Sequence, residues 1–295
     1  MSAPVAARSP AVLPVAAMAP LLVAAGAIFL FTGMDAIIKG LPAGLTIVQI
    51  VAMRFTFAVP PALLMAWRAR ALSGHTAWRA NGLRGVLVLG TCALFFFALR
   101  RLPFAETLAL SFLAPLFMVL LAAALLGERL RLKVLGAVAV GFAGVAVILS
   151  GGLSAAGTDR LGAAAAMGAA VCYAGSMILL RRQAQRDRPE MIVLIQQVVP
   201  AVLTLPLALA DWTPQPPLMW AAFMLLGTLG VGGQFLLTWA YARAPTGALA
   251  VMEYTALPWA ALIGFAVFGE VPTATVLLGG ALILGACLAV TRLRR

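Results

Sequence analysis

Charged side chains are scarce in this chain. Only 10% of its 295 residues are Asp, Glu, Lys or Arg, whereas 63% are hydrophobic. A soluble protein of this size could not cover its surface with so few charges. Apolar runs of roughly 20 residues, the length that crosses a bilayer as a helix, recur along the whole sequence. The composition excludes a soluble globular protein and predicts an all-α polytopic protein in a lipid bilayer.

Histidine and clustered cysteine, the usual ligands of transition metals, are nearly missing. His75 is the single histidine and falls in a polar linker, while Cys92, Cys172 and Cys287 fall in apolar runs without CxxC spacing. We therefore expect no metal site, no cofactor and no histidine-based catalysis. The sequence also has no GxxxxGK[ST] motif, so ATP-driven pumping is not expected.

Acidic residues are outnumbered, which gives a net charge of +12. The basic residues stand in short clusters between apolar runs, and no basic face is interleaved with aromatic residues. Nucleic acid is therefore not an expected partner. The clusters instead resemble the cytoplasmic charge bias of membrane proteins.

The apolar runs predict ten transmembrane helices after a cytoplasmic tail at residues 1–18. The first half of the chain, 19–150, and the second half, 161–292, would each hold five of them. The expected spans are about 19–39, 45–67, 83–99, 104–126, 132–150, 161–180, 191–210, 218–240, 246–268 and 274–292.

The basic residues also predict the orientation. We expect the chain to lie in a bacterial inner membrane with both termini in the cytoplasm. In this orientation sixteen Lys and Arg residues lie inside and four lie outside, while Arg54 lies within a span. The inside set is Arg8, Arg68, Arg70, Arg79, Arg84, Arg129, Arg131, Lys133, Arg181, Arg182, Arg186, Arg188, Arg243, Arg292, Arg294 and Arg295; the outside set is Lys39, Arg100, Arg101 and Arg160.

One half of the sequence is a diverged copy of the other. Arg101 and Arg243 are 142 residues apart, and the same offset relates Gly127-Glu128 to Gly269-Glu270. Five spans in each copy is an odd number, so the second copy would enter the membrane from the opposite side. Inverted repeats around a central cavity are the architecture of secondary transporters.

These features resemble the drug/metabolite transporter superfamily, and specifically its EamA-type ten-helix members. The resemblance rests on the repeated Gly-Glu, on Pro115 and Pro258 in the preceding helices, and on segments 31–39 and 49–54, which are similar to those of S-adenosylmethionine and riboflavin uptake proteins. It implies that the third, fourth, eighth and ninth spans line a cavity around which the first, second, sixth and seventh move.

Ionisable groups deep in the membrane are the leading candidates for a binding or coupling site. Arg54 lies about nine residues into its span, or roughly 14 Å along the helix, where a charge costs at least about 2.5–3.5 kcal/mol. Glu253, followed by Tyr254, lies seven residues into the ninth span and matches Ser111 in the repeat. We expect Arg54 and Glu253 to form a pair that binds substrate or a proton; structural contacts between helices are the alternative.

Other polar residues in the spans have two interpretations. Asp35 and Lys39 are four apart on one helix face, so they would form either a structural pair or a gate or substrate contact. Three further residues are candidates for ligand contact or for glue between helices, namely Gln196, Gln234 and Trp239.

Prolines within the spans and glutamates at the ends of the spans have roles of their own. Pro115 and Pro258 would interrupt cavity helices and free backbone carbonyls. Glu128 and Glu270 lie at helix ends beside glycine, where a structural role is expected.

The leading hypothesis is a secondary transporter that moves a small polar metabolite, amino-acid-like, nucleoside-derived or a vitamin, with protons as the candidate coupling ion. An intramembrane enzyme would need a nucleophile with a base or a metal cluster, and neither is recognisable. A passive channel or scaffold is the third class. The sequence leaves open the substrate, the direction of transport and the oligomeric state.

Overall fold

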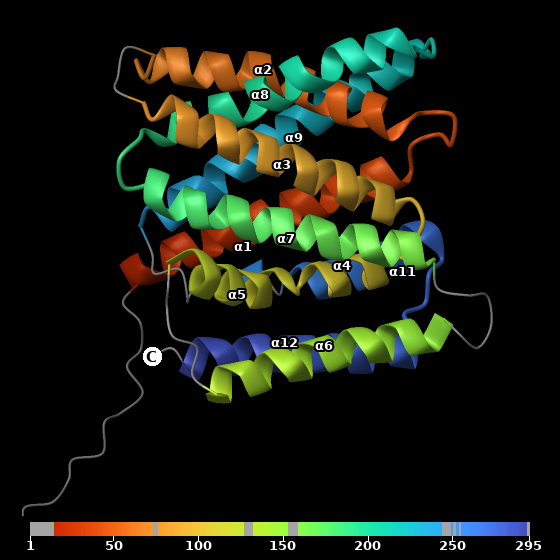
Figure 1. Ribbon diagram of the computed structural model, residues 1–295. Coiled ribbons are helices and arrows are strands. Elements are labelled where there is room, and N and C mark those ends of the chain that lie inside the picture. The colour runs from red at the N-terminus through yellow and green to blue at the C-terminus, as the bar shows by residue number, and fades with distance from the viewer. Residues whose placement is uncertain are drawn as a thin grey trace, which may run out of the picture.

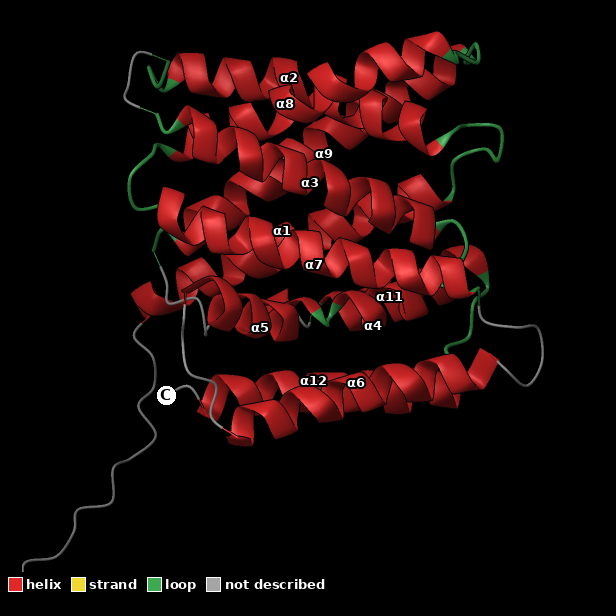
Figure 2. Ribbon diagram, viewed as in Figure 1, coloured by secondary structure: helices red, strands yellow, loops and turns green. Residues whose placement is uncertain are grey.

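A computed structural model describes residues 15–72, 76–126, 132–152, 159–243, 249, 252–253 and 255–293. Within these residues the protein is all-helical and contains no strand (Figure 2). The helices are α1 (Val15–Lys39), α2 (Ile47–Arg68), α3 (Trp78–Leu99), α4 (Phe104–Ser111), α5 (Ala114–Leu126), α6 (Leu132–Gly152), α7 (Arg160–Gln183), α8 (Pro189–Ala210), α9 (Pro217–Tyr241), α11 (Ala256–Phe268) and α12 (Ala274–Leu293).

The predicted spans correspond closely to these helices. Six helices are long and apolar enough to cross a membrane, namely α1, α2, α3, α7, α8 and α9, and α6 and α12 contain shorter apolar segments. Two helix starts differ from the expected ones by four and five residues. Helix α1 begins at Val15, inside the expected tail, and α3 begins at Trp78, five residues before the predicted start at 83.

The predicted fourth span is two helices rather than one. Helix α4 ends at Ser111 and α5 begins at Ala114, one residue before Pro115. A proline has no N–H to donate to the carbonyl four residues earlier, and its ring clashes with that carbonyl, which here belongs to Ser111. Pro258 is the third residue of α11, where it is tolerated in the first turn.

The two halves of the chain are interleaved rather than separate. Helix α2 packs on α8, α3 on α7, α1 on α9 and α6 on α12, so that each of these helices has a major neighbour from the other half. Figure 1 shows the helices as roughly parallel rods, with α2 and α8 at one edge of the molecule and α6 and α12 at the other.

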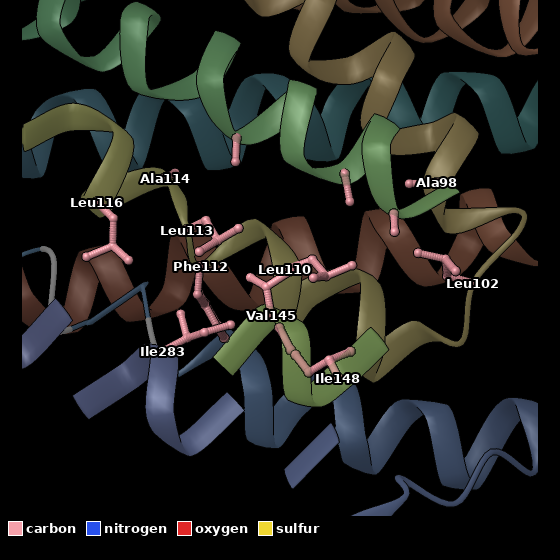
Figure 3. Packing of buried hydrophobic residues seen from close by; sticks show 14 of the residues in the cluster. Ala98, Leu102, Leu110, Phe112, Leu113, Ala114, Leu116, Val145, Ile148 and Ile283 are labelled. Carbon is pink, nitrogen blue, oxygen red and sulfur yellow. The ribbon is translucent and has the colours of Figure 1, made fainter. Parts of the chain in front are cut away.

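A buried apolar cluster joins the α4–α5 break to the helices around it (Figure 3). Phe112 and Leu113, the two residues between α4 and α5, are both buried, and they share the cluster with Ile148 of α6 and Ile283 of α12. The break in the helix is therefore filled by side chains.

Salt bridges and hydrogen bonds connect the ends of the helices. Asp159 accepts hydrogen bonds from the Gly162 and Leu161 N–H groups and pairs with Arg101, 2.7 Å away, and these contacts hold the pKa of the Asp159 carboxyl below its usual value. At the opposite end of the molecule, buried Asp187 after α7 accepts hydrogen bonds from Asn81 and from the Ala77 N–H. Both ends thus tie the first half of the chain to the second.

Glu270 joins three helices at the end where α11 stops. Its Oε1 lies 2.8 Å from Lys39 Nζ at the end of α1, and its Oε2 accepts a 2.7 Å hydrogen bond from the Phe104 N–H at the start of α4. Gly269 makes this turn possible because its φ of 65° lies in the left-handed region, which favours glycine. Glu128, its counterpart in the repeat, lies outside the described residues.

The close crossing of α6 and α12 depends on two glycines. A Cβ on Gly144 would lie 2.7 Å from the Gly279 carbonyl oxygen, and a Cβ on Gly279 would lie 2.5 Å from the Gly144 carbonyl oxygen. Small residues allow helix backbones to approach closely in membranes, where van der Waals packing drives helix association.

We expect Gly279→Val to push α6 and α12 apart and to lower stability by about 1–3 kcal/mol, as overpacking typically does. The thermal unfolding midpoint of the protein in detergent measures the effect. Gly285→Val on the same helix is the matched control, because a Cβ at Gly285 meets no atom within 4 Å. Equal losses from both substitutions would contradict this account of the crossing.

We also expect Glu270→Gln to act on stability rather than on transport. The amide leaves Lys39 without its ionic partner, which should cost about 1–2 kcal/mol at this partly exposed position. Arg101→Gln, which breaks the more exposed pair with Asp159, should cost less. A Glu270→Gln protein that is produced normally and unfolds normally but cannot transport would show that Glu270 belongs to the transport machinery.

Candidate functional site

A cavity of about 220 Å³ lies between the two halves of the chain. It is lined from the first half by α1, α2, α3 and α4, and from the second half by α7, α8, α9, Glu253 and Ala256. The lining therefore includes the third, fourth, eighth and ninth spans, as the family resemblance implied. It also includes the first, second, sixth and seventh spans, which are α1, α2, α7 and α8. Most of the wall is apolar, so the few polar side chains in it decide what the cavity can bind.

Most of the predicted site residues meet at this cavity although they are far apart in the sequence. The lining includes Asp35, Arg54, Ser111, Gln196, Gln234 and Glu253. Trp239 is not part of the lining; its ring instead stacks against the Arg243 guanidinium, 4.1 Å away. Tyr254 lies outside the described residues.

Arg54 is a buried cation with few partners. Its side chain projects from α2, the residue is only 4% exposed, and Nε and Nη1 have no hydrogen-bond partner. The guanidinium lies 4.2 Å from the Phe55 ring centroid and close to Gly230 of α9, where a Cβ would come within 3.1 Å of Nη2. The absence of a side chain at Gly230 makes room for this guanidinium.

The sequence predicted a pair of Glu253 with Arg54, but the two residues do not form an ion pair. Among the described residues the ion pairs are Lys39–Glu270 and Arg101–Asp159. Glu253 Oε1 instead accepts hydrogen bonds from the hydroxyl groups of Tyr173 in α7, at 3.1 Å, and Tyr241 in α9, at 3.0 Å. The carboxyl group is thus held by two phenols from neighbouring helices.

Asp35 and Lys39 do not form the structural pair that was one of their two interpretations. Lys39 is the last residue of α1, and its Nζ bonds Glu270 and the Leu102 carbonyl, each at 2.8 Å. Asp35 lies one turn deeper, is buried, and lines the cavity within electrostatic range of Arg54. It therefore belongs to the cavity and not to the contact between Lys39 and Glu270 at the end of the helix.

Sequence reasoning missed Arg84 and the two tyrosines. Arg84 was counted with the cytoplasmic clusters, but α3 begins early enough to place it inside the helix, where it is 2% exposed and lines the cavity. Tyrosine offered a weak signal, since the chain has only three, at 173, 241 and 254. Two of these bond Glu253 and the third follows it directly.

The repeat places equivalent positions of the two halves around the same cavity. Eight pairs of lining residues are separated by the 142-residue offset, namely Ile28 and Ala170, Phe31 and Tyr173, Met34 and Ser176, Asp35 and Met177, Arg54 and Gln196, Cys92 and Gln234, Phe95 and Leu237, and Ser111 and Glu253. In no pair is the charged residue matched by another charge. The cavity is thus built from equivalent backbone positions that carry different chemistry.

Comparison with known proteins identifies the family. Residues 18–150 and 160–292 each match the EamA-like transporter family. A pseudopaline exporter from Pseudomonas aeruginosa is 29% identical over 93% of this chain and 96% of its own length. A riboflavin transporter from Rhizobium johnstonii is 31% identical over 81% and 77%, respectively. An S-adenosylmethionine uptake transporter from Rickettsia prowazekii is 25% identical over 70% and 69%.

A solved crystal structure shows the same fold. It aligns with a TM-score of 0.64 and 24% identity, and the alignment covers 93% of this chain and 96% of the other. The resemblance to the EamA-type proteins is confirmed, and the relatives are transporters rather than enzymes. This multi-pass membrane protein belongs to the EamA-like transporter family of the drug/metabolite transporter superfamily.

Proposed function

We propose that this protein is a secondary active transporter that moves a small polar metabolite across the cytoplasmic membrane by alternating access. The observation that carries the proposal is the cavity, which is lined by both halves and contains buried charged side chains. Buried ionisable groups inside a membrane bundle are costly and typically mark a substrate or ion path. The names of the relatives, which concern pseudopaline, riboflavin and S-adenosylmethionine, support a small organic cargo.

The pattern of helix contacts supports an inverted repeat. Exchange of the two halves converts the α3–α7 contact into the α9–α1 contact and leaves the α2–α8 and α6–α12 contacts unchanged. A two-fold axis relating the halves 19–150 and 161–292 has this property. With five spans in each half, such an axis lies in the membrane plane, and exchange of the two conformations alternates the open side.

The charge distribution supports an inner-membrane orientation with both termini in the cytoplasm. Arg84 is buried in α3 and is therefore not counted among the basic residues at the membrane surface. Fifteen basic residues remain on the inner side, against four on the outer side. This asymmetry is still strong.

In this mechanism Arg54 binds an acidic group of the substrate, and Glu253 binds a proton or a substrate amine. Glu253 suits such exchange because two neutral phenols hold it, and no cation of the described residues pairs with it. A passive channel lined by the same residues would not accumulate solute against a gradient, so transport measurements distinguish the two.

We expect Arg54→Ala to abolish uptake while the protein still reaches the membrane. Labelled metabolites are offered to proteoliposomes that contain the purified protein, with and without a proton gradient, and the variant is then compared on whichever compound the wild type accumulates. Arg243→Ala is the control, since that arginine stacks on Trp239 outside the cavity. Normal uptake by Arg54→Ala would exclude Arg54 from the site, and equilibration without saturation in the wild type would favour a channel.

We expect Glu253→Gln to remove the dependence of uptake on pH if the carboxyl carries the coupling proton, or to remove binding if it holds an amine. Uptake measured across pH, together with direct binding of the same compound, separates the two roles. Glu106→Gln is the control, because Glu106 is a buried carboxyl that does not line the main cavity. A Glu253→Gln protein with the wild-type pH profile and affinity would eliminate both roles.

A further inference from the structure

Two guanidinium groups that line the cavity have no hydrogen-bond partner among the described residues. Arg54 and Arg84 both line it, and each is at least 96% buried. Neither forms an ion pair or a hydrogen bond with another described residue, and Nε of both, together with Nη1 of Arg54, is buried without any acceptor. A buried cation without a partner is strongly unfavourable, so an anion is the expected occupant of the space beside it.

The carboxyl groups of the cavity do not supply these partners. Asp35 is within electrostatic range of Arg54 but forms no ion pair with it. Glu253 accepts its hydrogen bonds from two tyrosines, Tyr173 and Tyr241, and forms no ion pair with either arginine. Each arginine therefore keeps free donors within the cavity.

The two arginines approach the cavity from different surroundings. Arg54 projects from α2 toward Gly230 of α9 and Met34 of α1, because a Cβ on Gly230 would lie near both side chains. Arg84 projects from α3, the helix that packs on α7 and α8, and lines the cavity together with Tyr173 of α7. The lining that the two share contains apolar rings, including Phe31, Phe95 and Phe112, which suit a carbon skeleton.

We infer that the substrate carries two carboxylate groups, one bound by Arg54 and the other by Arg84. The inference rests on the proposed function and narrows its substrate class to a small organic diacid. A guanidinium presents a planar fork of donors that matches a carboxylate with two parallel hydrogen bonds. A diacid would satisfy both forks at once, whereas a monoacid would leave one buried cation unpaired.

A set of four-carbon compounds tests the number and sign of the charges at constant chain length. Succinate carries two carboxylates, 4-aminobutyrate one carboxylate and one amine, butyrate one carboxylate, and 1,4-diaminobutane two amines. Each is added to the purified full-length protein in detergent at fixed ionic strength, and binding is measured by calorimetry and by the shift in unfolding temperature.

We expect succinate to bind most tightly and 1,4-diaminobutane not to bind. Arg84→Gln and Arg54→Gln should each weaken succinate roughly tenfold to a hundredfold, the value of a hydrogen bond to a charged group, and should leave the preference of succinate over butyrate much reduced. Arg84→Lys keeps the charge without the fork and should fall between. Arg101→Gln removes an arginine outside the cavity and should bind as the wild type does.

Several results would overturn the proposal that the substrate is a diacid. Tighter binding of 4-aminobutyrate than of succinate would indicate a single-carboxylate zwitterion. Binding of succinate that is unchanged in Arg84→Gln, provided that this variant unfolds cooperatively, would remove Arg84 from the site. Failure of all four compounds to bind would also refute the diacid. Uptake of another metabolite into proteoliposomes would still uphold the transporter, so the two failures are distinguishable.

Discussion

A charge placed inside a membrane has to be enclosed by protein, and this constraint organises the molecule. The hydrocarbon region offers no water and no counterions, so Arg54, Arg84 and Glu253 are tolerable only where helices exclude lipid from them. The interleaving of the two halves provides this enclosure, because helices from both halves form the wall around these groups. Local details follow from it, such as the missing side chain at Gly230 that admits the Arg54 guanidinium.

The sequence predicted the helices and three of the four charged residues that line the cavity, namely Asp35, Arg54 and Glu253, because both depend on one property, the depth of a residue in an apolar run. Hydrophobic length located the spans, and an ionisable or amide side chain within a span identified Arg54, Glu253 and Gln196. The split of the fourth span is explained by Pro115, although the sequence alone could not show whether the helix would bend or end there.

The wrong or missing predictions concern features that do not depend on how deep a residue lies in an apolar run. Arg84 was missed because the start of α3 was placed five residues too late, which left the arginine at the membrane surface rather than in the wall of the cavity. Helical spacing allowed Lys39 to pair with Asp35, but at the end of α1 the Lys39 side chain reaches Glu270 from the other half. The tyrosines that hold Glu253 follow no periodic pattern. Each case depends on tertiary contacts, which neither helix periodicity nor hydropathy specifies.

The divergence of the two halves makes the cavity asymmetric, because equivalent positions carry different side chains. If every charged residue had an identical counterpart at the offset of 142, the cavity would offer a substrate two equivalent orientations. Instead, Arg54 is matched by Gln196, and Glu253 by Ser111. Equivalent backbone positions preserve the helix pairing that an exchange of conformations would require, while unequal side chains allow one orientation of an asymmetric ligand. The repeat can therefore supply the motion, and its differences can supply the selectivity.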